Sequence, residues 1–316
     1  MAESYLIADI GATNARFRVI NEFEDPRDLA LRTVDYGTSK ELLMMAKAEL
    51  QIRSLSGAMR SVAGPVSQDG VSVVLTNSGH LFLAEELREI LGCQVWFEND
   101  FVALAHGLDC FIELLQLGGD SKTGTVSAVL GPGSGLGMAT ILRQENCLRV
   151  LASEGGHADF APGSHLESEI WSVLAMDSKY VSWETVLSGK GLVRLYQAMC
   201  QVWGSKCSNY KAEDITRLGV SLDDPICHQT LETFYGILGS AAGNFALTVG
   251  ALGGVYLAGS IVPATSDFAV KSPLRRRFEE KEALDQLLRK VPIFIIRDSS
   301  PGLIGVEQCL RKQLKC

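Results

Sequence analysis

Short runs of hydrophobic residues, separated by polar residues and glycines, divide the first third of the chain into strands and helices. Residues 5–8 form a short apolar run that ends at turn residues, and residues 16–20 alternate between polar and apolar side chains. Both patterns are typical of strands. Thr38 and Glu41 have the spacing of a capping box, which predicts the start of a helix. The pattern predicts strands at 5–8, 16–20, 57–63, 71–75 and 94–97, and helices at 38–50 and 83–91.

The remainder of the chain repeats this order of elements. After Asp100 the pattern is helical to about residue 117, and glycines predict a loop at 118–124. Strands are expected at 125–130, 136–143 and 148–152, followed by mostly helix, two strands at 254–258 and 291–296, and a last helix from residue 303. This recurrence indicates a duplicated α/β unit with a mixed sheet in each copy and a short hinge near residues 101–110.

One long stretch, residues 233–266, contains no Asp, Glu, Lys or Arg. It has room for a membrane-spanning helix of about 20 residues. Several glycines and Asn244 interrupt it, however, and divide it into a helix that ends near Gly250 and the strand at 254–258. Helices that are apolar on all sides also occur in the interior of large proteins. The sequence therefore predicts a buried core helix and no membrane span.

The composition excludes some classes of partner. With 316 residues, 47% hydrophobic and 21% charged, the chain has ordinary globular composition and the length of about two domains. A net charge of −8 disfavours nucleic acid and anionic membranes, because both bind basic surfaces. None of the 8 cysteines forms a C-x-x-C pair, and no secretory signal precedes Tyr5. We therefore expect reduced thiols and a cytoplasmic protein.

Two glycine-containing turns have features that bind phosphate. Residues 9–14 read Asp-Ile-Gly-Ala-Thr-Asn between two predicted strands. Gly11 lets the backbone approach a ligand, successive N–H groups form an anion nest, and Asp9 can hold a hydrated Mg²⁺. Residues 131–137 read Gly-Pro-Gly-Ser-Gly-Leu-Gly, which is neither a Walker A nor a Rossmann motif. An ordinary structural turn is the alternative for each segment.

An amide and two carboxylates follow the strand at 94–97. Glu98, Asn99 and Asp100 lie between two phenylalanines, where a carboxylate can be desolvated and can accept a hydrogen bond from a substrate hydroxyl. A general base requires this arrangement. The alternative is a helix N-cap at Asn99 or Asp100, and the two roles are compatible.

Two further segments suit other parts of a substrate. Glu154 and His157 share one loop, which suits the hydroxyls of a polyol, whereas a metal site there lacks a second His or a Cys. Gly259 and Ser260 end a predicted buried strand, and their small side chains permit a flat purine to lie on the backbone. Simple packing between a strand and a helix is the alternative for this second segment.

Taken in order, these segments closely resemble the bacterial glucokinase family, the non-zinc group of the sugar kinase, heat-shock and actin-like superfamily. The resemblance covers essentially the whole chain, and residues 153–162 and 184–189 are its specific blocks. It implies a duplicated ribonuclease-H-like α/β fold, with two lobes, a mixed sheet in each and a cleft between them. The implied small domain is 1–107 completed by a C-terminal helix at 297–316, and the large domain is 108–296.

The resemblance also implies the roles of individual residues. Asp100 is expected to be the catalytic base, with Mg²⁺ bound through water at Asp9. The glucose ligands that it implies are Asn99, Asp100, Glu154, His157 and Glu184. The ATP contacts that it implies are Ala8, Asp9, Ile10, Gly11, Ala12, Thr13, Asn14, Gly133, Ser134, Gly135, Gly259 and Ser260.

The implied reaction transfers the γ-phosphoryl group of ATP to the 6-hydroxyl of glucose, in a cytoplasmic homodimer. The family usually has glycine where Ala12 and Ser260 stand, so we expect weaker ATP affinity. Two alternatives remain. One is a kinase for another hexose, such as fructose, mannose or an amino sugar; the other is a sugar-sensing protein that keeps the fold without turnover.

Overall fold

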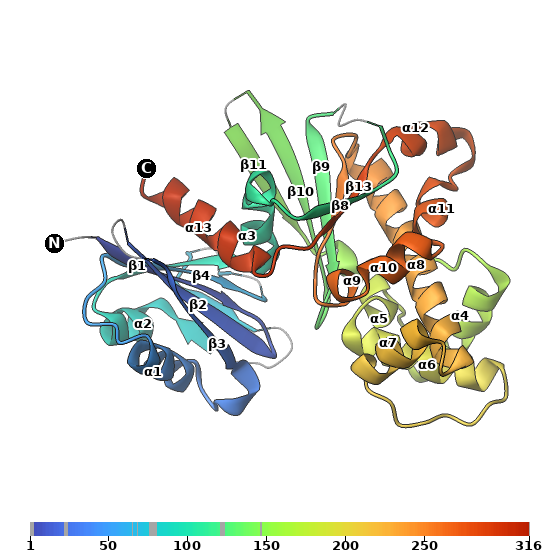
Figure 1. Ribbon diagram of the computed structural model, residues 1–316, viewed down its shortest axis with the longest axis horizontal. Coiled ribbons are helices and arrows are strands. Elements are labelled where there is room, and N and C mark those ends of the chain that lie inside the picture. Colours follow the sequence, from blue (N-terminus) through green and yellow to red (C-terminus); the bar gives the residue numbers. More distant parts are fainter. Residues whose placement is uncertain are drawn as a thin grey trace. The chain divides into compact units, whose positions relative to one another are not determined.

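The computed structural model describes residues 3–21, 25–64, 66–67, 69–75, 81–120, 124–145 and 147–315 (Figure 1). Its contacts divide the chain into two units. Unit 1 consists of residues 1–112 and 298–316, and unit 2 consists of residues 113–297. The sequence places the domain boundaries at 107 and 297, and these stay predictions.

Unit 1 is built on a five-stranded mixed sheet in the order β3-β2-β1-β4-β7. Neighbouring strands are antiparallel from β1 to β3, whereas β4 and β7 run parallel to β1. The strands are β1 (Ser4–Ile10), β2 (Asn14–Asn21), β3 (Arg27–Arg32), β4 (Gly57–Val62) and β7 (Gln94–Asn99). A separate hairpin consists of β5 (Ser72–Val74) and β6 (Leu81–Leu83), and two 3₁₀ turns are η1 (Thr33–Asp35) and η2 (Leu108–Cys110).

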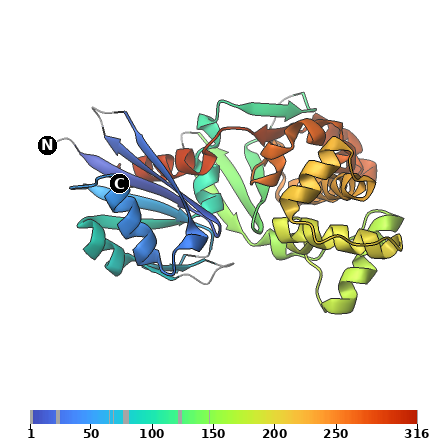
Figure 2. The ribbon, with the colours of Figure 1, turned by 60° about the horizontal axis from the view of Figure 1, so that its bottom comes forward.

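Helices cover both faces of this sheet (Figure 2). The helices α1 (Ser39–Glu49) and α2 (Ala84–Leu91) enclose one hydrophobic core, and α3 (Asp100–His106) and α13 (Pro301–Gln313) enclose another. The expected capping box begins α1, since the Glu41 amide donates to Thr38 Oγ1 (3.2 Å) and the Thr38 amide to Glu41 Oε2 (3.3 Å). Because a Cβ on Gly107 would lie 3.0 Å from the backbone of Gly305, glycine permits α3 and α13 to pack closely.

Unit 2 has a six-stranded mixed sheet in the order β11-β10-β9-β12-β13-β8. Its strands are β8 (Leu114–Leu117), β9 (Val126–Pro132), β10 (Leu136–Gln144), β11 (Cys147–Ser153), β12 (Val255–Leu257) and β13 (Ile293–Ile296). Its helices are α4 (His165–Asp177), α5 (Trp183–Val186), α6 (Gly189–Val202), α7 (Ala212–Ser221), α8 (Pro225–Val249), α9 (Ile261–Ala264), α10 (Ser266–Lys271), α11 (Leu274–Glu279) and α12 (Asp285–Lys290), with 3₁₀ turns η3 (Gly155–His157) and η4 (Glu282–Leu284).

The same strand arrangement occurs in both units. In each, a three-stranded antiparallel meander (β1–β2–β3 or β9–β10–β11) is followed by two parallel strands next to its first strand (β4 and β7, or β12 and β13). This repetition confirms the predicted duplicated α/β fold with a mixed sheet in each half.

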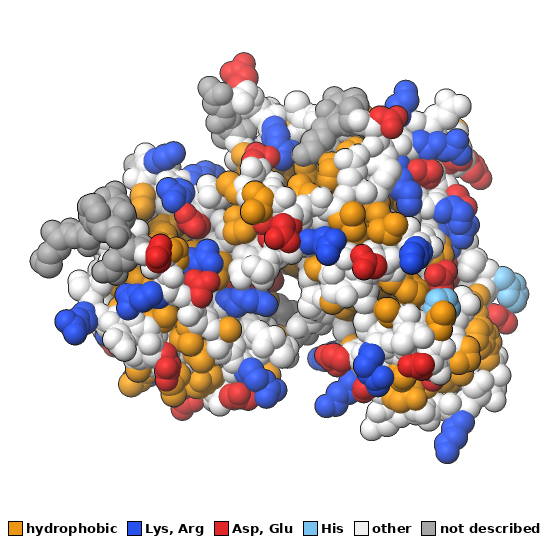
Figure 3. Space-filling view, in the orientation of Figure 1, with side chains coloured by type: hydrophobic (Ala, Val, Ile, Leu, Met, Phe, Trp, Pro, Cys, Tyr) orange, Lys and Arg blue, Asp and Glu red, His pale blue; other side chains and the backbone are white. Residues whose placement is uncertain are grey.

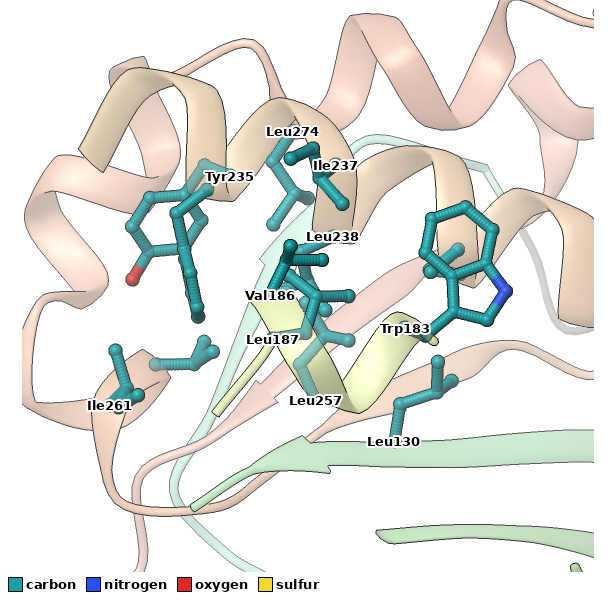
Figure 4. Close-up of a cluster of buried hydrophobic side chains, with 14 of the residues drawn as sticks. Leu130, Trp183, Val186, Leu187, Tyr235, Ile237, Leu238, Leu257, Ile261 and Leu274 are labelled. Carbon is teal, nitrogen blue, oxygen red and sulfur yellow. The ribbon is translucent and has the colours of Figure 1, made fainter. Parts of the chain in front are cut away.

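The uncharged stretch forms part of the hydrophobic core of unit 2. The helix α8 begins after Asp224, which caps it, and ends at Gly250, whose φ of 68° suits glycine. Its Tyr235, Ile237 and Leu238 pack into one buried cluster (Figure 4). Among the described residues, no helix is long and apolar enough to cross a membrane. The prediction of a core helix ending near Gly250 is confirmed.

One predicted element is wrong in part, and two strands were missed. The helix expected from Asp100 to residue 117 ends at His106, and the stretch Leu114–Leu117 is instead β8, which pairs with β13. A short apolar run does not distinguish a helix from a buried strand, and here the sheet edge of unit 2 decides. The strands β3 and β6 were not predicted. Part of the loop expected at 118–124, residues 121–123, lies outside the described residues.

Arg60, on β4, has an unusual environment. It is 0% exposed, and none of its three side-chain nitrogens has a hydrogen-bond partner among the described residues. Burial lowers the pKa of Arg60 to about 10. A buried charge without a partner destabilises the folded state.

Replacing Arg60 with methionine should therefore raise the free energy of unfolding, by about 1 kcal/mol or more. Urea unfolding measures this change. The exposed Arg53 supplies the matched control, since Arg53→Met should stay within about 0.5 kcal/mol of the parent. A less stable Arg60→Met variant would show that the guanidinium is stabilising where it lies.

His106, the last residue of α3, is expected to make unit 1 less stable in acid. Burial, and then the charge of Lys312, lowers the pKa of His106 from 6.5 to about 4. Between these two values the unfolded chain binds the proton more readily, so stability should fall as the pH drops from about 6.5 to about 4. Allowing for solvent screening, we expect a loss of about 1–2 kcal/mol. Denaturant unfolding at pH 7 and pH 4.5 should show a smaller loss in His106→Gln.

Candidate active site

The carboxyl ends of three parallel strands bring two predicted segments to the same edge of the sheet in unit 1. In the register of these strands, Ile10 of β1 pairs with Val62 of β4, and Val62 pairs with Asn99 of β7. The turn after β1 and the start of α3 therefore lie at one edge. Ligands bind at this edge in open α/β sheets.

Asp9 is held at this edge by its neighbours. Ser61 Oγ donates to Asp9 Oδ1 (2.9 Å). Burial raises the pKa of Asp9, whereas the hydrogen bond from Ser61 and the charge of Arg16 lower it. Gly302, at the start of α13, lies directly against the carboxylate, and a Cβ there would collide with Asp9 Oδ2. A cation near Asp9 would stabilise its ionised form.

Hydrogen bonds from Thr33, a residue outside the turn, hold the predicted first phosphate turn. The Gly11 amide donates to Asn14 O (2.9 Å), which closes the turn. The Thr33 amide donates to Thr13 O (2.9 Å), and Thr33 Oγ1 donates to Gly11 O (2.9 Å). Thr33 is 2% exposed, and it follows β3, a strand that the sequence pattern did not predict. The contribution of Thr33 was therefore missed.

Asn99 is the N-cap of α3, so this alternative is confirmed. Asn99 Oδ1 accepts from the amides of Phe101 (3.0 Å) and Val102 (3.1 Å), and its Nδ2 donates to Gly64 O (3.3 Å). Asp100, half-buried, is the first residue of α3, and its Oδ1 accepts from the Phe101 amide (3.0 Å). Burial raises the pKa of the preceding Glu98. The cap fixes Asp100 at the edge where Asp9 also lies.

In unit 2, both predicted nucleotide segments adjoin one another. The glycine turn joins β9 to β10, and the Gly133 amide donates to Gly135 O (2.8 Å). Parallel pairing of β12 with β9 places Gly259 beside Pro132. Gly259 has a φ of 86°, and a Cβ there would collide with Pro132 O, so glycine is required twice over. A Cβ on Gly133 would lie 4.0 Å from Ser260 Oγ.

In unit 2, the first specific sequence block pairs with the residues just before the second, 181–183. The Phe160 amide donates to Val181 O (2.9 Å), and the Trp183 amide donates to Ala158 O (2.9 Å). This ladder brings η3, which carries His157, and the preceding Glu154 next to α5, which carries Glu184. Glu154 and His157 are exposed and Glu184 is half-buried.

Glu184 also reaches the glycine turn. The Leu136 amide donates to Glu184 Oε2 (2.8 Å), and the Gly189 amide donates to Gly133 O (2.8 Å). A Cβ on Gly135 would collide with this carboxylate, and a Cβ on Gly156 would collide with Leu136 O. The predicted sugar ligands and the predicted phosphate turn of unit 2 are therefore parts of one hydrogen-bonded assembly.

Besides the predicted site residues, the described surface has a cavity and charged side chains of both signs. A cavity of about 730 Å³ is lined by residues of α1 and its surroundings, among them Lys40, Lys47 and Arg53, and contains none of the predicted site residues. On the face in Figure 3, Lys and Arg side chains are interspersed with Asp and Glu. No group of three or more His, Cys, Asp or Glu in the described part of the chain is arranged to hold a metal ion.

Comparison with known proteins finds similarity to glucokinases over nearly the whole chain. A family model described as Glucokinase matches residues 6–313. The glucokinase of Chromobacterium violaceum is 37% identical over 314 residues, which cover 98% of this chain and 90% of the relative. The crystal structure of a glucokinase from an Antarctic psychrotroph is 31% identical with a TM-score of 0.81, over 98% of this chain and 99% of that chain.

A more distant structure has the same fold. The ROK family glucokinase of Streptomyces griseus, in complex with glucose and AMPPNP, is 18% identical with a TM-score of 0.69, over 98% of this chain and 99% of that chain. The matched family model and the relatives above 30% identity establish the relationship. The chain belongs to the glucokinase family.

Proposed function

We propose that this protein is an ATP-dependent glucokinase that transfers the γ-phosphoryl group to the 6-hydroxyl of glucose, with Asp100 as the general base. The observation that carries the proposal is the sheet edge of unit 1, where parallel strands bring the turn after Asp9 and the capped start of α3 together. Asp100 accepts the proton of the hydroxyl as the oxygen attacks phosphorus, and the oxygen–phosphorus bond to ADP breaks.

The two glycine-containing turns are proposed to bind the phosphates of ATP. Support comes from the braced turn after β1 and from the closed turn between β9 and β10. Mg²⁺ usually binds through one or two carboxylates and phosphate oxygens, so the single carboxylate of Asp9 fits such a site. When bound, the ion neutralises charge on the phosphates. We propose that Gly259 and Ser260 lie at the adenosine.

The sugar is proposed to contact Asn99, Glu154, His157 and Glu184. The ladder between residues 158–160 and 181–183 supports this, because it holds three of these four side chains on adjacent turns of unit 2. Asn99 has its carbonyl oxygen engaged in the cap and donates one amide N–H to Gly64 O, so its second amide N–H is the one available to a sugar. We further propose that the protein is cytoplasmic and forms a homodimer. Light scattering of the purified protein tests the dimer.

A coupled assay of ADP release by the purified protein, across a panel of hexoses, tests the proposed function. We expect glucose-dependent consumption of ATP and the highest kcat/KM for glucose. A higher kcat/KM for fructose, mannose or an amino sugar would assign the protein to that sugar instead. Glucose binding without ADP release would favour the sugar-sensing alternative.

A further inference from the structure

Glu184 belongs to the segment proposed to bind glucose, and its carboxylate contacts the turn between β9 and β10 that is proposed to bind phosphate. Its backbone belongs to the block that the family resemblance assigns to glucose, and its carboxylate oxygen Oε2 accepts the Leu136 amide (2.8 Å), the first residue of β10 after the glycine turn. Gly135 lies against the same carboxylate, so closely that a Cβ there would collide with it. The side chain thus touches the segment proposed to bind phosphate.

The backbone around Glu184 is held in place by caps and by buried neighbouring side chains. Ser182 and Thr185 form a capping box at the start of α5, and Ser188 Oγ donates to Glu184 O (3.0 Å). On either side of Glu184, the side chains of Trp183, Val186 and Leu187 are at most 7% exposed and lie in the hydrophobic core (Figure 4). A carboxylate on so firmly held a backbone can fix the position of the turn that it contacts.

We propose that Glu184 is a positioning residue for the phosphate-binding turn, in addition to a sugar ligand, and that it couples nucleotide and sugar binding. The inference rests on the proposed function. A carboxylate has two oxygens, so Oε1 can accept a sugar hydroxyl while Oε2 keeps the Leu136 amide. Any sugar contact that favours this rotamer also favours the turn geometry, and by linkage a bound nucleotide favours the sugar equally.

Nucleotide binding in the absence of sugar separates the two roles. The probe is AMPPNP with Mg²⁺, titrated calorimetrically into the full-length protein without glucose. Glu184→Ala should bind AMPPNP about 5-fold or more weakly than the parent, because the loss of a hydrogen bond to a charged group leaves the turn unsupported. His157→Ala, which removes a proposed sugar ligand, should change the same Kd by less than about 2-fold.

The conservative variant tests the hydrogen bond itself. Glu184→Gln keeps an acceptor oxygen at the same reach, so its AMPPNP affinity without glucose should return to within about 2-fold of the parent, while its glucose affinity falls. An unchanged AMPPNP affinity in Glu184→Ala would overturn the proposal. A Gln variant as weak as the Ala variant would also overturn it, since charge and not the bond to Leu136 would then be responsible.

Amide hydrogen exchange gives a readout that needs no ligand. Exchange at residues 133–136 should become faster in Glu184→Ala and stay unchanged in Glu184→Gln and His157→Ala, with all variants folded by circular dichroism. Equal exchange in all four proteins would contradict the positioning role. If the parent neither binds nucleotide nor consumes ATP with glucose, the proposed function fails, and the exchange data still decide whether Glu184 holds the turn.

Discussion

Replacing Asp100 with asparagine is expected to lower kcat for glucose phosphorylation by about 10²- to 10⁴-fold, the usual contribution of a general base. The variant should fold normally, because the Asn99 side chain caps α3 and the substitution leaves that cap in place. Glucose affinity should change little, since an amide still forms hydrogen bonds with a sugar hydroxyl. The coupled ADP-release assay and calorimetric titration of glucose give both quantities.

Asp109→Asn supplies the control for this experiment. Asp109 is exposed in η2 of the same unit, so the change in charge is the same, and kcat should stay within about 2-fold of the parent. A kcat near the parental value in Asp100→Asn would remove Asp100 from the mechanism. A folded Asp100→Asn protein that no longer binds glucose would show that Asp100 acts mainly as a sugar ligand.

The second large effect concerns a buried ion pair in unit 2. Arg277 of α11 pairs with Glu167 of α4 at 2.5 Å, and their side chains are 11% and 4% exposed. Arg277 Nη2 also donates to Ser240 Oγ (2.8 Å), and Glu167 Oε2 accepts the Gly163 amide (2.7 Å). Removal of one partner leaves a buried charge, so Arg277→Ala should lower the free energy of unfolding by about 3–5 kcal/mol.

The neighbouring residue is a matched control. Arg276 pairs with Glu280 at 2.7 Å, but these side chains are 64% and 47% exposed. Such exposed pairs contribute about 0–1 kcal/mol, so Arg276→Ala should be nearly neutral in the same denaturant titration. Similar losses in both variants would mean that burial does not determine the contribution of the pair. Because Glu167 lies just after the block at 153–162, Arg277→Ala should also weaken glucose binding.

The sequence predicted best where local chemistry decides the structure. The capping box at Thr38 and the end of α8 near Gly250 require only near neighbours, and both occur as expected. The duplicated order of strands and helices was also visible, because alternation and glycine turns mark each element. Segments whose state depends on distant partners were less predictable. The strand β8, for example, pairs with β13, which lies far along the chain.

The sequence predicted which residue types form the candidate site, but not the hydrogen bonds from distant residues that hold them in place. Glycine turns and carboxylates at strand ends can be recognised in a sequence, whereas their braces come from elsewhere in the chain. Thr33, which follows β3 in the sequence, donates a hydrogen bond to the turn at Gly11. The hydrogen bond from the Leu136 amide to Glu184 likewise joins two segments that are distant in the sequence. Neither contact follows from local periodicity, because each joins residues that are far apart in the sequence.

The most direct test of the proposed catalytic role is a crystal structure of the protein with glucose, AMPPNP and Mg²⁺. The account predicts that a carboxylate oxygen of Asp100 lies about 2.6–3.2 Å from the 6-hydroxyl oxygen of the sugar, with that oxygen facing the γ-phosphate. A ternary complex in which the carboxylate of Asp100 is remote from the 6-hydroxyl, or contacts a different hydroxyl, would contradict it.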